Sequence, residues 1–184
     1  MSKVRRTTAA VAMAAIVVLV AGAVVALASS AHFKKGGEPA CTIAGSATSK
    51  TVRCTGTLAG LGGGDLSIPT TVSGSAVYQC QNGGGNIAPG QNRVLVGPST
   101  VPTNVPGSSV KNGEVTFTTQ PNTLTASTTV SGSQAGCPNG NWTGVNPTLT
   151  VTDITLKISQ DSTLLFTCTA SNAAGLTSPV RLTC

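Results

Sequence analysis

Charged and aromatic side chains are scarce in this chain of 184 residues. Asp, Glu, Lys and Arg make up only 9% of it, and aromatic residues only 3%. About a quarter of an average protein is charged, so this chain is too poor in charge for a coiled coil or a charged disordered tail. Small residues take the place of the charged ones, since 22 residues are Gly and many others are Ser or Thr.

The sequence has few of the residues that catalytic and metal-binding sites require. A Ser–His–Asp triad would have to use His32, the only His, which lies in a segment that we interpret as a linker. Paired carboxylates would have to be Asp153 and Asp161, which flank one predicted strand instead of facing each other. The sequence has no C-x-x-C spacing for zinc. We therefore expect no enzyme, no catalytic residues, no metal and no cofactor.

The N-terminus has the pattern of an export signal. Three basic residues among the first six precede an uncharged, apolar stretch over residues 9–28, which ends in small residues. This order is typical of a secretory signal peptide. A stretch of about 20 residues would also span a bilayer as a helix. Residues 1–31 are therefore predicted to be a signal peptide cleaved near Ala28 or, alternatively, a retained membrane anchor.

The export segment accounts for much of the positive charge. The whole chain has 11 basic and 5 acidic residues, a net charge of +6. From Cys41 onward, six basic residues remain, scattered along the sequence, against four acidic ones. A nucleic-acid partner would require a clustered basic face. We expect no such partner, and contact with a membrane only through the N-terminal segment if it stays uncleaved.

Apolar and polar residues alternate with a period of two along much of the chain after residue 41. Such alternation is typical of strands with one buried and one solvated face. Leu149 and Val151 alternate with Thr residues, but the next apolar residue, Ile154, has the opposite parity. One extra residue would cause this shift, so we predict a β-bulge near Asp153 or a strand that changes sheets.

Turn residues separate about eight such segments. Asn112-Gly113 is a strong signal for a two-residue hairpin turn, and the prolines within residues 98–106 are expected to interrupt strand pairing. Short strands at this spacing predict an all-β domain over residues 41–184, an immunoglobulin-like antiparallel β-sandwich. Residues 32–40 are predicted to be a flexible linker before it.

The cysteines are expected to hold this domain together. All six follow the apolar segment, which fits an oxidising compartment: Cys41, Cys54, Cys80, Cys137, Cys168 and Cys184. The domain has few aromatic side chains for its core, and each disulfide would add on the order of 3 kcal/mol of stability. One interpretation pairs Cys80–Cys137, Cys54–Cys168 and Cys41–Cys184. The alternative keeps two local pairs, Cys41–Cys54 and Cys168–Cys184.

Two segments carry a family resemblance. The first is CQNGGGNIAPGQN over residues 80–92, and the second is AGCPNGNWT over residues 135–143. Together with CTGTLAGL from Cys54, they resemble an uncharacterised family of small exported actinobacterial proteins with GGN-x-APGQN and CPN-x-NW motifs. The resemblance covers about residues 52–170 and implies export, a β fold and no catalytic residues. Cys41 and Cys184 lie outside it.

Residues 82–92 are predicted to be a long polar loop. Its Gly and Pro residues permit tight turns, and its amide side chains could fix the loop by hydrogen bonds to the backbone. The other interpretation is a recognition loop for sugar hydroxyls or a peptide, formed by Asn82, Asn86, Gln91, Asn92 and Trp142. Trp142 is interpreted as a core or cap residue beside Cys137, or alternatively as an exposed stacking platform.

The functional expectation follows from export, disulfides and the poor catalytic inventory. We expect a non-catalytic structural or adhesion protein, secreted or held at the cell surface. Its partners would be cell-envelope or extracellular components, with self-association through exposed strand edges. The alternative is a secreted protein that binds a small ligand or inhibits a protease, through a cleft near residues 82–92 or the loop over residues 97–107.

Overall fold

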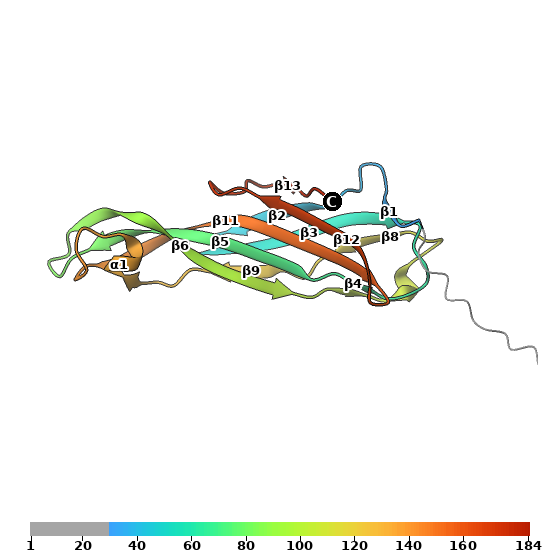
Figure 1. Cartoon of the computed structure of the whole chain (residues 1–184), viewed down its shortest axis with the longest axis horizontal. Helices are drawn as coiled ribbons and strands as arrows, with labels where there is room; N and C mark the ends of the chain where they lie inside the picture. Colours follow the sequence, from blue (N-terminus) through green and yellow to red (C-terminus); the bar gives the residue numbers. More distant parts are fainter. Residues whose placement is uncertain (1–29) are drawn as a thin grey trace, which may run out of the picture.

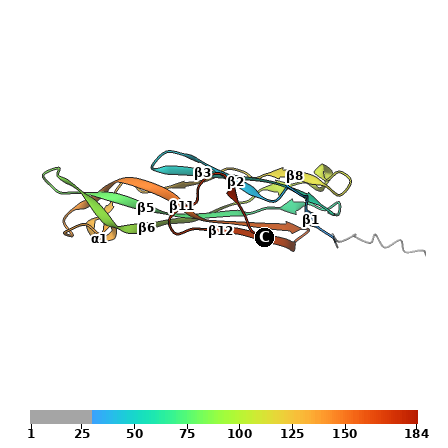
Figure 2. The same cartoon turned by 90° about the horizontal axis from the view of Figure 1, so that it is seen from above.

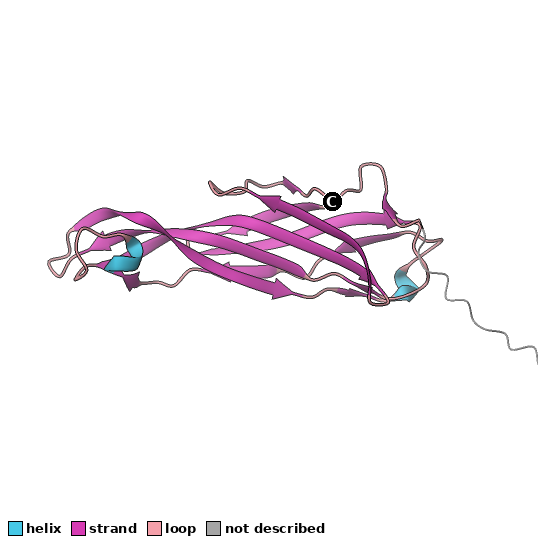
Figure 3. Ribbon diagram, viewed as in Figure 1, coloured by secondary structure: helices cyan, strands magenta, loops and turns pink. Residues whose placement is uncertain are grey.

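The computed structural model describes residues 30–184, which form an elongated antiparallel β-sandwich (Figures 1 and 2). Strands account for nearly all of its regular structure, as Figure 3 shows. The predicted signal peptide or anchor lies outside the described residues, apart from its last two. Within residues 30–184, none of the helices has the length and apolar character needed to cross a bilayer.

The first sheet, sheet A, has the strand order β1-β3-β2-β13, and β8 and β9 also pair with β3. Its strands are β1 (His32–Phe33), β2 (Ala40–Gly45), β3 (Ser49–Ala59), β8 (Val115–Thr118), β9 (Asn122–Thr125) and β13 (Val180–Arg181). Every pairing in this sheet is antiparallel.

The second sheet, sheet B, has the order β6-β5-β11-β4-β7, and β10 and β12 also pair with β11. Its strands are β4 (Leu66–Ser67), β5 (Thr70–Gln81), β6 (Ile87–Val101), β7 (Asn104–Val105), β10 (Val130–Ser131), β11 (Thr143–Gln160) and β12 (Thr163–Ser171). Two short helices complete the described chain: η1 (Gly107–Ser109) and α1 (Gly132–Ala135). Eight strands have four or more residues, and the other five are two-residue segments.

The core lies between the two sheets, on the apolar faces that the alternation predicts. Its largest fully buried side chains come from both sheets and include Leu58 and Phe117 of sheet A and Tyr78, Ile154 and Leu156 of sheet B. Thr side chains cover the outer faces, where β-branched residues suit a half-exposed strand. The predicted antiparallel β-sandwich is confirmed.

Local turn chemistry also follows the sequence. Val151 is opposite Gly74 and Asp153 is opposite Ser73, so β11 has one extra residue at this point. This confirms the bulge near Asp153. Asn112 and Gly113 have φ angles of 52° and 74°, the left-handed values of a two-residue hairpin turn.

The flexible linker predicted over residues 32–40 is instead part of the sandwich. β1 pairs with the end of β3, where Phe33 is opposite Leu58. The Phe33 ring lies 4.7 Å from that of Phe166, measured between centroids, and Lys34 Nζ lies 2.8 Å from a carboxylate oxygen of Glu114. Strand pairing and the burial of one aromatic ring keep this segment ordered, although it is too short to show an alternation of apolar and polar residues.

The prolines interrupt pairing less than expected. β6 continues through Pro89 and Pro98 and pairs with β5 along most of its length. β6 is the outer strand of sheet B in the strand order. Proline is tolerated on an edge strand because the missing N–H can face away from the neighbouring strand.

Two seams join the sheets along their sides. On one side, Val180 of β13 pairs with Cys41 in sheet A, and Thr183 exchanges backbone hydrogen bonds of 2.8 and 2.9 Å with Thr169 in sheet B. On the other, the buried Asn122 Nδ2 of sheet A donates to the carbonyls of Thr70 (2.7 Å) and Ser99 (2.9 Å) in sheet B.

The disulfides correct part of the predicted pairing. Cys80–Cys137 is confirmed, but Cys54–Cys168 and Cys41–Cys184 are wrong, and the local alternative is right: the structure pairs Cys41–Cys54, Cys80–Cys137 and Cys168–Cys184. Adjacent strands place the local partners opposite each other, as in the Cys41–Cys54 register pair.

Removal of Cys80–Cys137 should destabilise the domain most. This bridge spans 57 residues, against 13 and 16 for the others. Loop-closure entropy predicts a loss of about 4 kcal/mol for Cys80→Ala/Cys137→Ala and about 3 kcal/mol for each of the other Ala pairs. Urea unfolding of the three double variants measures this order. A smaller loss for the 57-residue loop than for the other two would contradict it.

Candidate functional site

The loop predicted over residues 82–92 is shorter in the structure. Gln81 of β5 pairs with Ile87 of β6, so the turn contains only residues 82–86. Asn82 forms this turn: its Oδ1 accepts from the backbone N–H groups of Gly84 (3.0 Å) and Asn86 (2.9 Å). The long loop is therefore wrong, because strand pairing extends into it. The structural interpretation holds for the side chain of Asn82.

A short segment that contains helix α1 and Cys137 lies beside this turn and is linked by a disulfide to the strand before it. Its helix α1 begins with a capping box between Ser131 and Gln134. The Cys80–Cys137 bridge ties the segment to β5, and Asn92 Nδ2 on β6 donates to the carbonyl of Ser133 at 3.3 Å. These contacts place α1 against the edge strand of sheet B.

Trp142 follows the cap interpretation. Its side chain is half-buried and packs against the core, as does Cys137. Its backbone N–H donates to the carbonyl of Asn139 at 3.1 Å, which closes the turn before β11. The fully exposed stacking platform considered from the sequence is not present at this position.

The predicted recognition residues come together at one end of the molecule. Figure 1 shows α1 near one end and β1, β4 and β8 near the other. Asn82, Asn86, Gln91 and Asn92 lie on the β5–β6 hairpin, and Trp142 precedes the pairing of Thr143 with Gln81. Asn86 and Gln91 are exposed and form no side-chain hydrogen bond with the described residues, so their amides face solvent.

Polar side chains are segregated along the long axis. We define the α1 end as residues 79–92 and 130–148. These ranges contain 10 of the chain's 16 Asn and Gln residues and no Asp, Glu, Lys or Arg. At the β1 end, in contrast, lie the Lys34–Glu114 ion pair and the carboxylates of Asp65 and Asp161. The α1 end so defined presents neutral hydrogen-bonding groups, and the first charged residue beyond it is the exposed Arg93, opposite Val77.

A groove near the turn over residues 82–86 contains Gln79 and Asn146, which the sequence alone did not indicate as site residues. It has a volume of about 480 Å³, and its lining includes Val77, Gln79, Pro89, Asn146 and Pro147. Asn146 Nδ2 donates to Gln79 Oε1 at 2.9 Å. The available signal was Asn146-Pro147 within a strand pattern, since Pro is unfavourable inside a central strand.

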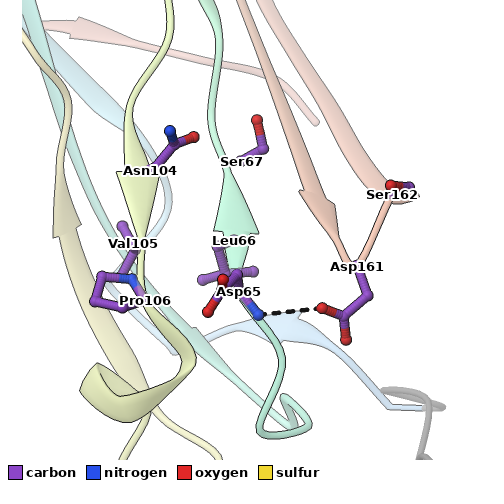
Figure 4. Close-up of a pocket in the computed structure, with 8 residues that line it drawn as sticks. All are labelled: Asp65, Leu66, Ser67, Asn104, Val105, Pro106, Asp161 and Ser162. Carbon is purple, nitrogen blue, oxygen red and sulfur yellow. Dashed lines mark hydrogen bonds between the residues drawn. The ribbon is translucent and has the colours of Figure 1, made fainter.

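A second hollow, of about 370 Å³, lies at the β1 end, and Figure 4 shows its lining residues. Both of its carboxylates accept hydrogen bonds from the backbone. Asp161 Oδ1 accepts from the N–H of Asp65 at 3.2 Å, and Asp65 Oδ1 accepts from the N–H of Gly107 at 2.7 Å. These acidic side chains therefore connect loops at this end.

Asp153 lies on β11, apart from this hollow. Ser171 Oγ donates to its carboxylate at 2.5 Å and Thr152 Oγ1 at 2.7 Å. These hydrogen bonds, that of Ser171 first, lower the pKa of Asp153 below its ordinary value, against a smaller opposing effect of burial. Asp161 is eight residues further along an extended strand, roughly 25 Å away. Residues 30–184 contain no cluster of three metal-ligating side chains.

Comparison with protein-family models, curated proteins and solved structures finds no match to this chain. The family resemblance of the two sequence motifs stays a prediction.

Asn82→Ala should destabilise the domain by about 1 kcal/mol, because two backbone N–H groups of the turn lose their acceptor. Thermal and urea unfolding measure this loss. Asn86→Ala, in the same turn, is the matched control and should change stability by less than about 0.5 kcal/mol. Equal losses in the two variants would show that Asn82 does not hold the turn.

Asp153→Asn should flatten the acid side of the stability profile. A carboxyl whose pKa is lowered by folding stabilises the native state above its unfolded pKa. That contribution disappears as the pH falls through the folded value, below about pH 4. Urea unfolding between neutral and acidic pH measures the slope. Glu38→Gln, at an exposed carboxylate without a hydrogen bond among the described residues, is the control, and an identical profile for Asp153→Asn and wild type would disprove this role.

Proposed function

We propose that this protein is a non-catalytic, exported structural or adhesion module of the cell surface or extracellular space. The observation that carries the proposal is the segregation of polar groups along an elongated sandwich. The preceding chain joins the domain at β1, near one end (Figure 1). The uncharged, amide-rich α1 end lies far from that junction, where an anchored molecule would present it to its surroundings.

The cysteines and the N-terminal sequence support export. Each of the six cysteines is in a disulfide, and such bonds persist in oxidising compartments. Cys41, Cys54, Cys80 and Cys168 are fully buried, so these bonds belong to the core. The basic and apolar N-terminal sequence supplies the matching export pattern.

The placement of the ionisable groups supports a role without catalysis. Asp65 and Asp161 accept backbone hydrogen bonds that join loops. The ring Nδ1 of His32 lies 2.7 Å from the carbonyl of Ser30, on the exposed first strand. Asp153 accepts hydrogen bonds from the hydroxyls of Ser171 and Thr152, but neither hydroxyl is hydrogen-bonded to a His or Lys among the described residues, the kind of base that activates a nucleophile.

We propose that partners contact the side chains of the α1 end and not the strand edges. Cell-envelope or extracellular components are the partners that an exported domain can reach. α1 and the Asn122 seam lie along β6, and residues 180–184 lie along β2 and β12. Covered edges disfavour addition of a further strand, so self-association would also use side chains.

The groove favours a second candidate function, a secreted protein that binds a small ligand. Its volume of about 480 Å³ is within the range of ligand sites. Native mass spectrometry of protein taken from the culture medium distinguishes this role. A carrier would retain a bound small molecule, whereas a structural module would be recovered without one.

Epitope tags at the two ends test the proposed display. One tag replaces Gly83–Gly85 in the β5–β6 turn, and the other is inserted between Asn112 and Gly113, in the hairpin near the β1 end. On intact cells that express the full chain, antibody should bind the first tag more strongly, because the second lies near the junction with the N-terminal segment. Protein released into the medium should show both tags equally.

Two further measurements complete this test. Cells that lack the protein should attach to each other or to a surface less well than cells that contain it, and the full chain should restore attachment. Tags that become accessible only after lysis would rule out export. Substrate turnover by the purified protein, abolished by a single substitution, would rule out the non-catalytic role.

A further inference from the structure

We propose that the groove beside Gln79 and Asn146 binds a neutral carbohydrate through two adjacent sugar hydroxyls. This inference deepens the proposed surface role and rests on it, since it names the class of extracellular partner. The site consists of the amide pair Gln79–Asn146 and walls formed by Val77, Pro89 and Pro147.

The groove exists because strand pairing is interrupted on both sides of Tyr78. On β11, Val145 is opposite Gln79 and Thr148 is opposite Val77, so two residues lie opposite Tyr78. On β6, Pro89 is opposite Gln79 and Arg93 is opposite Val77, so three residues do. Paired interruptions within a sheet leave ladder hydrogen bonds unmade, and bulges are enriched beside functional sites.

The inner wall at this point is fixed. Tyr78 is 2% exposed, and its hydroxyl donates to the carbonyl of Ser127 at 2.9 Å. Asn146 has a φ of 48°, a left-handed conformation that Asn tolerates, and its side chain is bonded to that of Gln79. The amide pair is therefore held in place before a ligand arrives, which limits the entropy lost on binding.

The amide pair offers one donor group and one acceptor side by side. Because Asn146 Nδ2 donates to Gln79 Oε1, the Nε2 group of Gln79 and the Oδ1 atom of Asn146 form no other hydrogen bond within the described residues. Each sugar hydroxyl both donates and accepts. Two neighbouring hydroxyls would therefore receive a hydrogen bond from Gln79 and donate one to Asn146.

The walls suit the apolar C–H faces of a sugar ring. Val77 is 38% exposed although its side chain is apolar, and the exposed Pro89 adds further apolar surface, whereas Pro147, which also lines the groove, is buried. No charged residue lines the groove. A neutral ligand with alternating apolar and hydroxyl surface matches this lining better than an anion, which would require Arg or Lys.

An extended peptide fits the site less well. Peptides that bind sheets add a strand to an open edge and gain main-chain hydrogen bonds there. The groove is lined by residues of β5, β6 and β11 and by Ala47 and Thr48 of the β2–β3 turn, and β5 itself has β6 on one side and β11 on the other. The polar side chains that line the groove include the amides of Gln79 and Asn146 and the hydroxyls of Thr48 and Thr148, so a ligand rich in hydroxyls is the better match.

A glycan array with the disulfide-bonded protein tests the proposal. The probes are neutral oligosaccharides of glucose, mannose, galactose and N-acetylglucosamine, with uronic-acid and sulfated oligosaccharides for comparison. We expect a neutral probe to bind, with an affinity that changes little between low and high salt. The side-chain amide signals of Gln79 and Asn146 should shift in nuclear magnetic resonance spectra on titration with it.

Asn146→Gly should weaken binding about tenfold or more, the scale of one lost hydrogen-bonding group. Gly keeps the left-handed backbone at this position. Asn112→Gly is the matched control, because Asn112 has a similar φ of 52° in a turn near the β1 end. Thr148→Tyr, at an exposed lining position, should also weaken binding by filling the groove.

Three results would overturn the proposal: no neutral probe binds, only anionic probes bind with strong salt dependence, or Asn112→Gly weakens binding as much as Asn146→Gly. Amide shifts confined to the turn over residues 82–86 would also assign binding elsewhere. These results leave the tag-accessibility and attachment measurements untouched, so a failure of carbohydrate binding can be told apart from a failure of the surface role.

Discussion

The structure depends on satisfying the backbone hydrogen-bonding groups along the sides of two facing sheets. Backbone N–H and C=O groups at an open edge are costly if buried and prone to pair with other chains if exposed. Here the Asn122 amide bridges the sheets on one side. Residues 180–183 bridge them on the other, with one backbone pairing to β2 and one to β12. These two seams turn a pair of sheets into one closed core.

The disulfides act together with these seams. Cys41–Cys54 joins β2 to β3 next to the pairing of Val180, and Cys168–Cys184 joins β12 to the seam residues beside Thr183. Cys80–Cys137 fastens the end of α1 to β5 of sheet B. The core has few aromatic side chains, so hydrophobic burial is limited for a domain of this length. Covalent closure therefore supports the positions where the chain covers its own edges.

Much of the fold could be predicted from the sequence, because alternation and turn chemistry are local. The buried parity of Val151 and Ile154 and the turn at Asn112-Gly113 required no knowledge of the neighbours. β1 could not be predicted, since two residues show no period, and the disulfide partners depend on which strands are adjacent. The amide pair of Gln79 and Asn146 was missed for the same reason: 67 residues separate them, and the pairing of β5 with β11 brings them together.

The seams cover part of β2, β6 and β12, and we propose that partners are bound by side chains instead. A sandwich with an open strand can bind peptides by its backbone, but one with covered edges has to use its side chains. At the β1 end, the carboxylates of Asp65 and Asp161 are engaged in holding loops. At the α1 end, amides such as Asn86 and Gln91 have no partner among the described residues, and the interrupted pairing around Tyr78 borders the groove. The recognition by neutral hydrogen bonds that we propose for the α1 end therefore relies on side-chain groups and not on strand edges.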